Sequence, residues 1–176
     1  NDAGIAWQPY AAGLEKAKSE KKPVCLVFFT EWCPHCTNYA KVFHDPKVVE
    51  KSKQFVMVRL DKDQNVELSE KYAPDGQYIP RTFFLSSAGT LEPSLSAPRE
   101  KFKYFYDEND PTSILAGMDA AVAKRQVIEA ESAFKSVVLP EPVPPEISML
   151  HWASMQRARN STDCSESEPM LIMSSI

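Results

Sequence analysis

The chain has 176 residues, of which 43% are apolar and 25% charged, ordinary proportions for a globular protein that can bury its own core. A net charge of −4, with no basic stripe interleaved with aromatic residues, argues against nucleic-acid binding. The longest apolar runs, such as 24–29, are too short to cross a bilayer, so we expect no membrane span.

The four cysteines are too few for a disulfide scaffold in a chain of this length. Cys33 and Cys36 form a CxxC pair, whereas Cys25 and Cys164 are isolated. Cysteine chemistry, rather than covalent stapling, is therefore the feature to explain. The chain begins with Asn1 instead of Met, which suggests a mature or trimmed form whose signal peptide has been removed.

The first part of the chain predicts helix, strand and helix in that order. Apolar residues from Trp7 onward keep a helical spacing over 5–21, and Pro23 ends that helix. The continuous apolar run 24–29 is typical of a central strand buried on both faces. A second helix is expected to begin at or just after Cys33, because Pro34 suits the first turn of a helix.

The later elements follow the same alternation. We expect a strand over 55–60, a helix over 66–72, a strand over 82–85 with a turn at 86–89 and a further strand, a connection over 92–110, and a helix from 110. Strands alternating with helices predict a layered α/β fold.

The composition changes at Leu139. The prolines at 140, 142, 144 and 145 predict a stiff linker, and the residues after them are rich in Ser, Met and Glu without a sustained period. We therefore predict one domain over 1–138, followed by a proline-rich linker and a disordered or loosely packed tail over 139–176.

The CxxC pair lies at the C-terminal end of the predicted central strand, where open α/β sheets place their sites. Only a thiolate carries out disulfide exchange. The start of the helix, a protonated His35 and the Cys36 thiol should each lower the pKa of Cys33. A stabilised thiolate makes the disulfide easier to reduce, so the intervening Pro34-His35 predicts oxidising chemistry.

A static disulfide and half of a zinc site are the alternatives for this pair. Zinc requires four ligands in a closed site, yet the sequence has no second CxxC, and His44, His151 and Cys25 are scattered. Covalent haem attachment would require His directly after Cys36, where Thr37 stands. We expect neither a metal nor an organic cofactor.

Residues Glu31–Cys36, at the end of an apolar strand, resemble the motif of the thioredoxin superfamily, and 63–65 and Ile79-Pro80 fall where thioredoxins have similar residues. The resemblance implies a thioredoxin-like fold with a central mixed β-sheet flanked by helices. It also implies that Pro80 is the family's cis-proline, facing the CxxC, and that Ile79, Pro80 and Trp32 bind the substrate.

Further segments are similar to a single-domain subgroup that includes bacterial periplasmic thioredoxin-like proteins and anterior-gradient-type proteins of the endoplasmic reticulum. They lie at 22–24, 55–58, 74–76, 78–81 and 103–106. The tetrapeptide Cys-Pro-His-Cys is the one used by the periplasmic disulfide oxidase DsbA, which implies a similar redox tendency.

Two positions bear on how the site would work. Thioredoxins and protein disulfide isomerases have a buried acid six residues before the first active-site cysteine, and here that position is Val27. Because the acid accepts the proton of the resolving cysteine, its absence weighs against fast thioredoxin-like reduction. Arg59 falls roughly where thioredoxin has a Lys.

These features predict a thiol–disulfide oxidoreductase that exchanges disulfides with protein thiols through Cys33 and Cys36, with Pro34 and His35 as further catalytic residues. We expect it to lean toward oxidation or isomerisation, to be monomeric and to need a redox-recycling partner. A non-catalytic chaperone-like or binding module is the alternative, motivated by Val27 and the aromatic segment 102–106.

The expected chemistry also bears on the compartment. An oxidising pair suits an extracytoplasmic compartment, since cytosolic reductants would keep it reduced. The end Ser174–Ile176 carries no ER-retention tetrapeptide, which favours the bacterial periplasm over the ER lumen or secretion.

Overall fold

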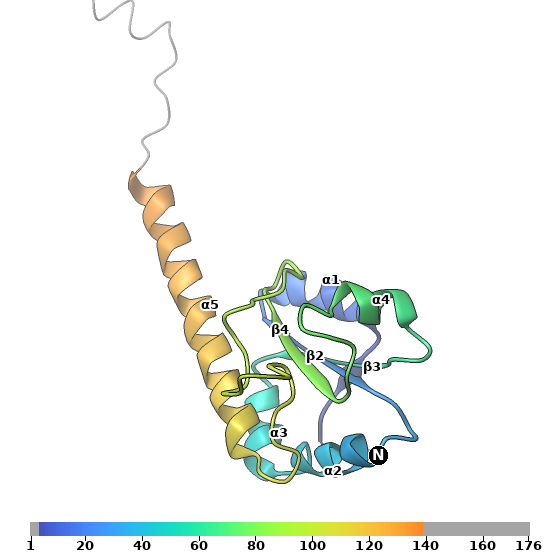
Figure 1. Ribbon diagram of the computed structural model, residues 1–176. Coiled ribbons are helices and arrows are strands. Elements are labelled where there is room, and N and C mark those ends of the chain that lie inside the picture. The colour runs from blue at the N-terminus through green and yellow to red at the C-terminus, as the bar shows by residue number, and fades with distance from the viewer. Residues whose placement is uncertain (1–3, 139–176) are drawn as a thin grey trace, which may run out of the picture. The chain divides into compact units, whose positions relative to one another are not determined.

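The computed structural model describes residues 4–138 (Figure 1). Contacts divide the chain into two units, 1–132 and 133–176, and the described part of the second unit is the end of one long helix. The predicted linker and tail over 139–176, with His151 and Cys164, lie outside the described residues.

The sheet has four strands in the order β1-β3-β2-β4. They are β1 (Trp7–Gln8), β2 (Val24–Phe29), β3 (Val56–Asp61) and β4 (Arg81–Leu85). β3 runs parallel to both β1 and β2, whereas β4 runs antiparallel to β2. The predicted α/β fold with a central mixed sheet is therefore confirmed, and β2, buried along nearly its whole length, is one of its two inner strands.

Helices cover both faces of the sheet. They are α1 (Tyr10–Glu20), α2 (Pro34–Val42), α3 (Pro46–Ser52), α4 (Val66–Lys71) and α5 (Thr112–Val138). Alternate β2 side chains enter two separate cores, since successive residues of a strand point to opposite faces. One core packs against α1 and α4, and the other against α2, α3 and the first turns of α5 (Figure 1).

Three elements differ from the sequence-based expectation. Trp7 is not helical: it pairs with Met57 as the edge strand β1, and α1 begins only after Pro9. α3 was not predicted, although Asp45 caps it by accepting hydrogen bonds from the backbone N–H groups of the two residues after Pro46. The strand expected after the turn at 86–89 is reduced to a single bridge from Leu91 to Leu85.

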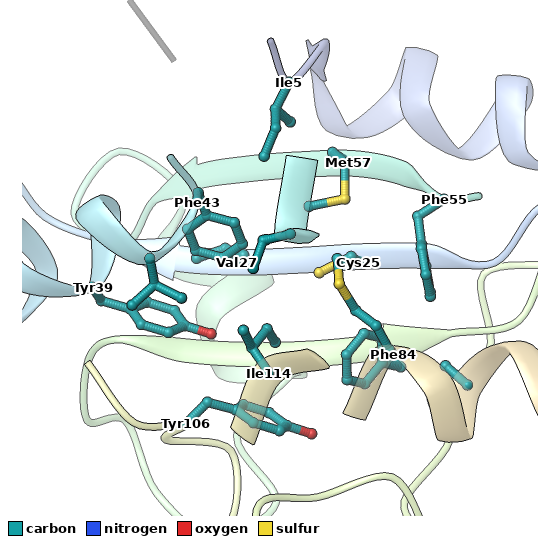
Figure 2. Close-up of a cluster of buried hydrophobic side chains, with 14 of the residues drawn as sticks. Ile5, Cys25, Val27, Tyr39, Phe43, Phe55, Met57, Phe84, Tyr106 and Ile114 are labelled. Carbon is teal, nitrogen blue, oxygen red and sulfur yellow. The ribbon is translucent and has the colours of Figure 1, made fainter. Parts of the chain in front are cut away.

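The core beneath α2 is aromatic and closely packed (Figure 2). The ring of Tyr39 meets Phe43 edge-to-face at 5.1 Å, and its hydroxyl is hydrogen-bonded to the Thr82 hydroxyl of β4 at 2.8 Å. Val27 lies in the same cluster with only 2% of its surface exposed. An apolar side chain therefore fills the β2 position at which thioredoxins carry their buried acid.

Candidate dithiol site

The two cysteines sit at the N-terminus of α2, as the sequence predicts. Cys33 is the N-cap residue in an extended conformation, and Pro34 occupies the first turn. The backbone N–H of Cys36 donates to Cys33 Sγ at 3.3 Å. The first turn of α2 thus directs a free N–H group, and the positive end of the helix dipole, at the Cys33 sulfur.

Both thiols are free, and both are largely covered: Cys33 is 4% exposed and Cys36 6%. Burial raises the pKa of the Cys36 thiol to about 12, with further contributions from its hydrogen bond to Cys33 and from the charge of Glu108. The backbone of Thr30 acts in the opposite direction. Cys36 is therefore a thiol at neutral pH.

His35 projects away from the core, and its side chain is 63% exposed. Its Nδ1 lies 2.8 Å from Oε2 and 3.0 Å from Oε1 of Glu108, a carboxylate in the segment before α5. The His35 ring also meets the edge of Phe105 at 6.1 Å, and Arg99 lies 4.7 Å over that phenyl ring. The sequence-based reasoning placed His35 beside Cys33 but missed Glu108, which is 73 residues away in the chain.

Trp32 stands beside the dithiol with 69% of its surface exposed. Its indole Nε1–H donates to Oδ2 of Asp63 at 2.8 Å. Asp63 is itself held by a hydrogen bond from its backbone N–H to Asp61 Oδ1 at the end of β3. The exposed indole ring, in the turn after β2, is thus oriented by a carboxylate in the loop after β3.

The Ile79–Pro80 peptide bond is cis; Ile79 is half-buried and Pro80 is buried. The next residue, Arg81, is fully buried and holds the preceding loop. Its guanidinium donates to the carbonyl oxygens of Ser69, Tyr72 and Gly76 at 3.3, 2.8 and 3.0 Å. The loop that carries Pro80 is thus tied to the end of α4 from inside the protein.

On the outer side of the same loop, the Tyr78 hydroxyl donates to Asp75 Oδ2 at 2.7 Å and accepts the Tyr104 backbone N–H at 2.9 Å. Phe102, which is exposed, meets the Tyr78 ring edge-to-face at 4.8 Å. The exposed Phe102 ring is thus held against Tyr78, which lies two residues before the cis-proline in the sequence.

The remaining candidate residues have other surroundings. Arg59 lies against the rings of Trp7 and Phe29, at 5.2 and 4.9 Å. Cys25 is fully buried in the core, and burial raises the pKa of its thiol. Within residues 4–138, no group of three or more His, Cys, Asp or Glu side chains is placed to hold a metal ion. None of the helices over the same residues is long and apolar enough to cross a membrane.

Comparisons with known proteins identify relatives of this chain. A family model described as thioredoxin-like matches residues 6–87, which include the CxxC turn and Pro80. The anterior gradient protein 2 homolog of Homo sapiens is 31% identical over 121 residues, covering 67% of each chain. Anterior gradient protein 2 of Xenopus laevis is 31% identical over 120 residues, covering 66% of this chain and 63% of its own.

Two solved structures share the fold. A thioredoxin from Thermus thermophilus aligns with a TM-score of 0.53 and 21% identity, covering 69% of this chain and 90% of its own. A DsbH oxidoreductase aligns with the same TM-score and identity, covering 69% and 86%. From fold, motif and relatives together, the chain belongs to the thioredoxin superfamily, in the single-domain thioredoxin-like subgroup that includes the anterior gradient proteins.

Proposed function

We propose that this protein is a thiol–disulfide oxidoreductase that exchanges disulfides with protein thiols through Cys33 and Cys36. The observation that carries the proposal is the 3.3 Å hydrogen bond from the Cys36 N–H to Cys33 Sγ at the start of α2. It directs the helix N-terminus at a sulfur that must hold negative charge during exchange. Membership of the thioredoxin superfamily supports a redox role in general.

In the oxidising direction, a substrate thiolate attacks Cys33 Sγ of the Cys33–Cys36 disulfide. The bond between the two enzyme sulfurs breaks, Cys36 leaves as a thiolate and takes up a proton, and Cys33 is joined to the substrate in a mixed disulfide. A second substrate thiolate then attacks the substrate sulfur and expels the Cys33 thiolate. The substrate has lost two electrons and the enzyme holds them as one thiolate and one thiol.

The surrounding residues supply helix geometry and substrate contact in this scheme. Pro34 begins α2 and His35 tunes the dithiol, while Trp32, Ile79 and Pro80 contact the incoming chain. The function leans toward oxidation or isomerisation, because Val27 offers no proton acceptor to Cys36 in the reducing direction. A monomer, reoxidised by a separate redox partner in an extracytoplasmic compartment such as the periplasm or the ER lumen, fits this chemistry.

The decisive test is disulfide formation in a reduced, unfolded substrate protein by the oxidised enzyme. Cys33→Ser should remove nearly all of the exchange rate, since burial raises the pKa of the other described thiols, Cys25 and Cys36, and keeps them protonated at neutral pH. Cys36→Ser cannot form the enzyme disulfide and should also be inactive in this assay; given a disulfide-bonded substrate, its Cys33 thiolate should attack the substrate disulfide and accumulate as the mixed disulfide. Cys25→Ala, which removes a buried thiol, is the matched control and should retain activity. Full exchange by a folded Cys33→Ser variant would exclude the proposal.

The alternative, a chaperone-like binding module, is favoured by one specific observation. Trp32 and Phe102 are large, exposed apolar side chains, and Phe102 packs on Tyr78 just before the cis peptide bond. Binding of an unfolded polypeptide by the Cys33→Ser/Cys36→Ser double variant would support this function. Binding that disappears with Cys33 would count against it.

A further inference from the structure

The carboxylate of Glu108 is the acidic group that meets the dithiol turn. Both of its oxygens lie within 3.0 Å of His35 Nδ1, and its side chain is only 15% exposed, so the contact is less screened by water than an ordinary surface pair. Glu108 is also one of the charges that raise the pKa of the neighbouring Cys36 thiol. Its negative charge therefore acts on both the imidazole and the sulfurs.

The charge of the pair is lower than that of an imidazole alone. If His35 is protonated, the ion pair has no net charge, and if it is neutral, the imidazole donates its Nδ1–H and the pair carries one negative charge. A histidine without this partner would carry between zero and one positive charge near neutral pH. In both protonation states Glu108 makes the net charge at the turn more negative by one.

Removal of positive charge affects the redox equilibrium in one direction. Reduction of the disulfide produces the Cys33 thiolate, and a thiolate is less stable where the local charge is more negative. The disulfide is then harder to reduce, and the protein is a weaker oxidant of other thiols.

Other charged groups lie near the His35–Glu108 pair. Arg99 reaches the site only through the Phe105 ring. Lys41, His44 and Asp45 line a hollow with Glu108 on the side of α2 away from its first turn. The comparison of Glu108→Gln with Glu108→Asp, which share these neighbours, therefore isolates the effect of the Glu108 charge.

We propose that Glu108 is a positioning residue that neutralises His35 at the dithiol and makes the Cys33–Cys36 disulfide a weaker oxidant than its Cys-Pro-His-Cys sequence alone implies. This inference rests on the proposed function, since it concerns the equilibrium of the same pair.

The test is an equilibrium titration of the full chain against glutathione at pH 7, with the two redox states separated after alkylation. Glu108→Gln removes the charge and keeps a hydrogen-bonding group. It should raise the equilibrium constant for oxidation of glutathione about three- to tenfold, which corresponds to a potential about 15 to 30 mV more oxidising. Glu108→Met, which also lacks the charge, should shift it in the same direction, and it serves as the test if the Gln variant does not fold.

Two controls separate charge from structure. Glu108→Asp keeps the charge and should stay within about twofold of the parent. Glu100→Gln, the same substitution at an exposed position of the same segment, should also leave the constant unchanged within about twofold. An unchanged or lower constant in Glu108→Gln overturns the inference while the pair still cycles. A pair that never cycles in the parent protein instead removes the proposed function.

Discussion

The indole N–H of Trp32 donates to the carboxylate of Asp63, and this single contact joins the turn that carries the dithiol to the loop that follows β3. The ring is mostly exposed, so the hydrogen bond rather than packing sets its orientation. The turn beside Cys33 is therefore oriented in part by a residue 31 positions further along the chain.

Replacing Asp63 with Ala should release the Trp32 ring and weaken turnover of protein substrates. A hydrogen bond of this kind contributes about 1 kcal/mol, so kcat/KM should fall roughly fivefold. Exchange with glutathione, which is too small to need the indole, should change little. The comparison of the two substrates is the measurement, and Asp63→Asn, which keeps an acceptor oxygen, is the control. An equal loss with both substrates would contradict a role in binding.

The buried Cys36 thiol should make the reduced protein sensitive to alkali. Its pKa is raised from an ordinary 9.0 to about 12, so the folded state holds its proton more tightly than the unfolded state. This contribution is fully present below about pH 9 and is lost as the pH rises from 9 toward 12. Urea unfolding of the reduced protein at pH 7, 9 and 10.5 should show the loss.

Cys36→Ala is the control for this pH effect, because it removes the titrating thiol and nothing else that ionises. Its free energy of unfolding should decline less over the same range than that of the reduced parent. Identical declines in the two proteins would show that other groups, such as buried tyrosines, cause the loss.

An acid at position 27 should change how fast the resolving cysteine works. Val27 is 2% exposed beneath α2, so Val27→Asp places a carboxyl group in the core and should cost about 3 kcal/mol of stability. It should also supply a proton acceptor to Cys36 and speed release of substrate from the mixed disulfide at pH 7. Stopped-flow measurement of that release is the readout, and Val27→Asn, polar but without a base, is the control. A release rate equal in both variants would show that the acid is not used here.

Arg81 should be among the most costly positions to replace. Its buried guanidinium serves three backbone carbonyls, and it is packed over Phe28 and Phe83 at 5.1 and 5.7 Å. Arg81→Met leaves those carbonyls unpaired and should lower the free energy of unfolding by about 3 kcal/mol or more. Arg81→Lys should recover only part of the lost stability, because an ammonium group cannot reproduce the planar arrangement of N–H donors of a guanidinium. Denaturant unfolding checks both values, and a Met variant as stable as the parent would refute the argument.

The elements that could be predicted from the sequence are those with strong local signals. β2 is a continuous apolar run, and α2 begins at Pro34 after a capping residue, so both follow from neighbouring residues alone. Asp45-Pro46 is an equally local signal for the start of α3, with Asp45 as the capping residue and Pro46 in the first turn. The spacing between Trp7 and Tyr10 is typical of a helix, but Trp7 pairs with Met57 of β3 and is therefore part of a strand.

The partners of the site residues could not be predicted in the same way. Glu108 and Asp63 are separated in sequence from His35 and Trp32 by 73 and 31 positions, and no local pattern ties such pairs together. The burial of Arg81 could not be predicted either, since a charged residue beside a proline ordinarily suggests an exposed turn.

The near-complete covering of Cys33 limits the kind of molecule that can react with it. Since only 4% of the surface of Cys33 is exposed, a disulfide or thiol in a rigid surface would have to reach a residue that its neighbours almost completely cover. A flexible, extended stretch of polypeptide can adapt to such a covered residue more readily than the surface of a folded domain. If the proposed exchange takes place, we therefore expect it to favour thiols and disulfides in chains that have not yet completed folding.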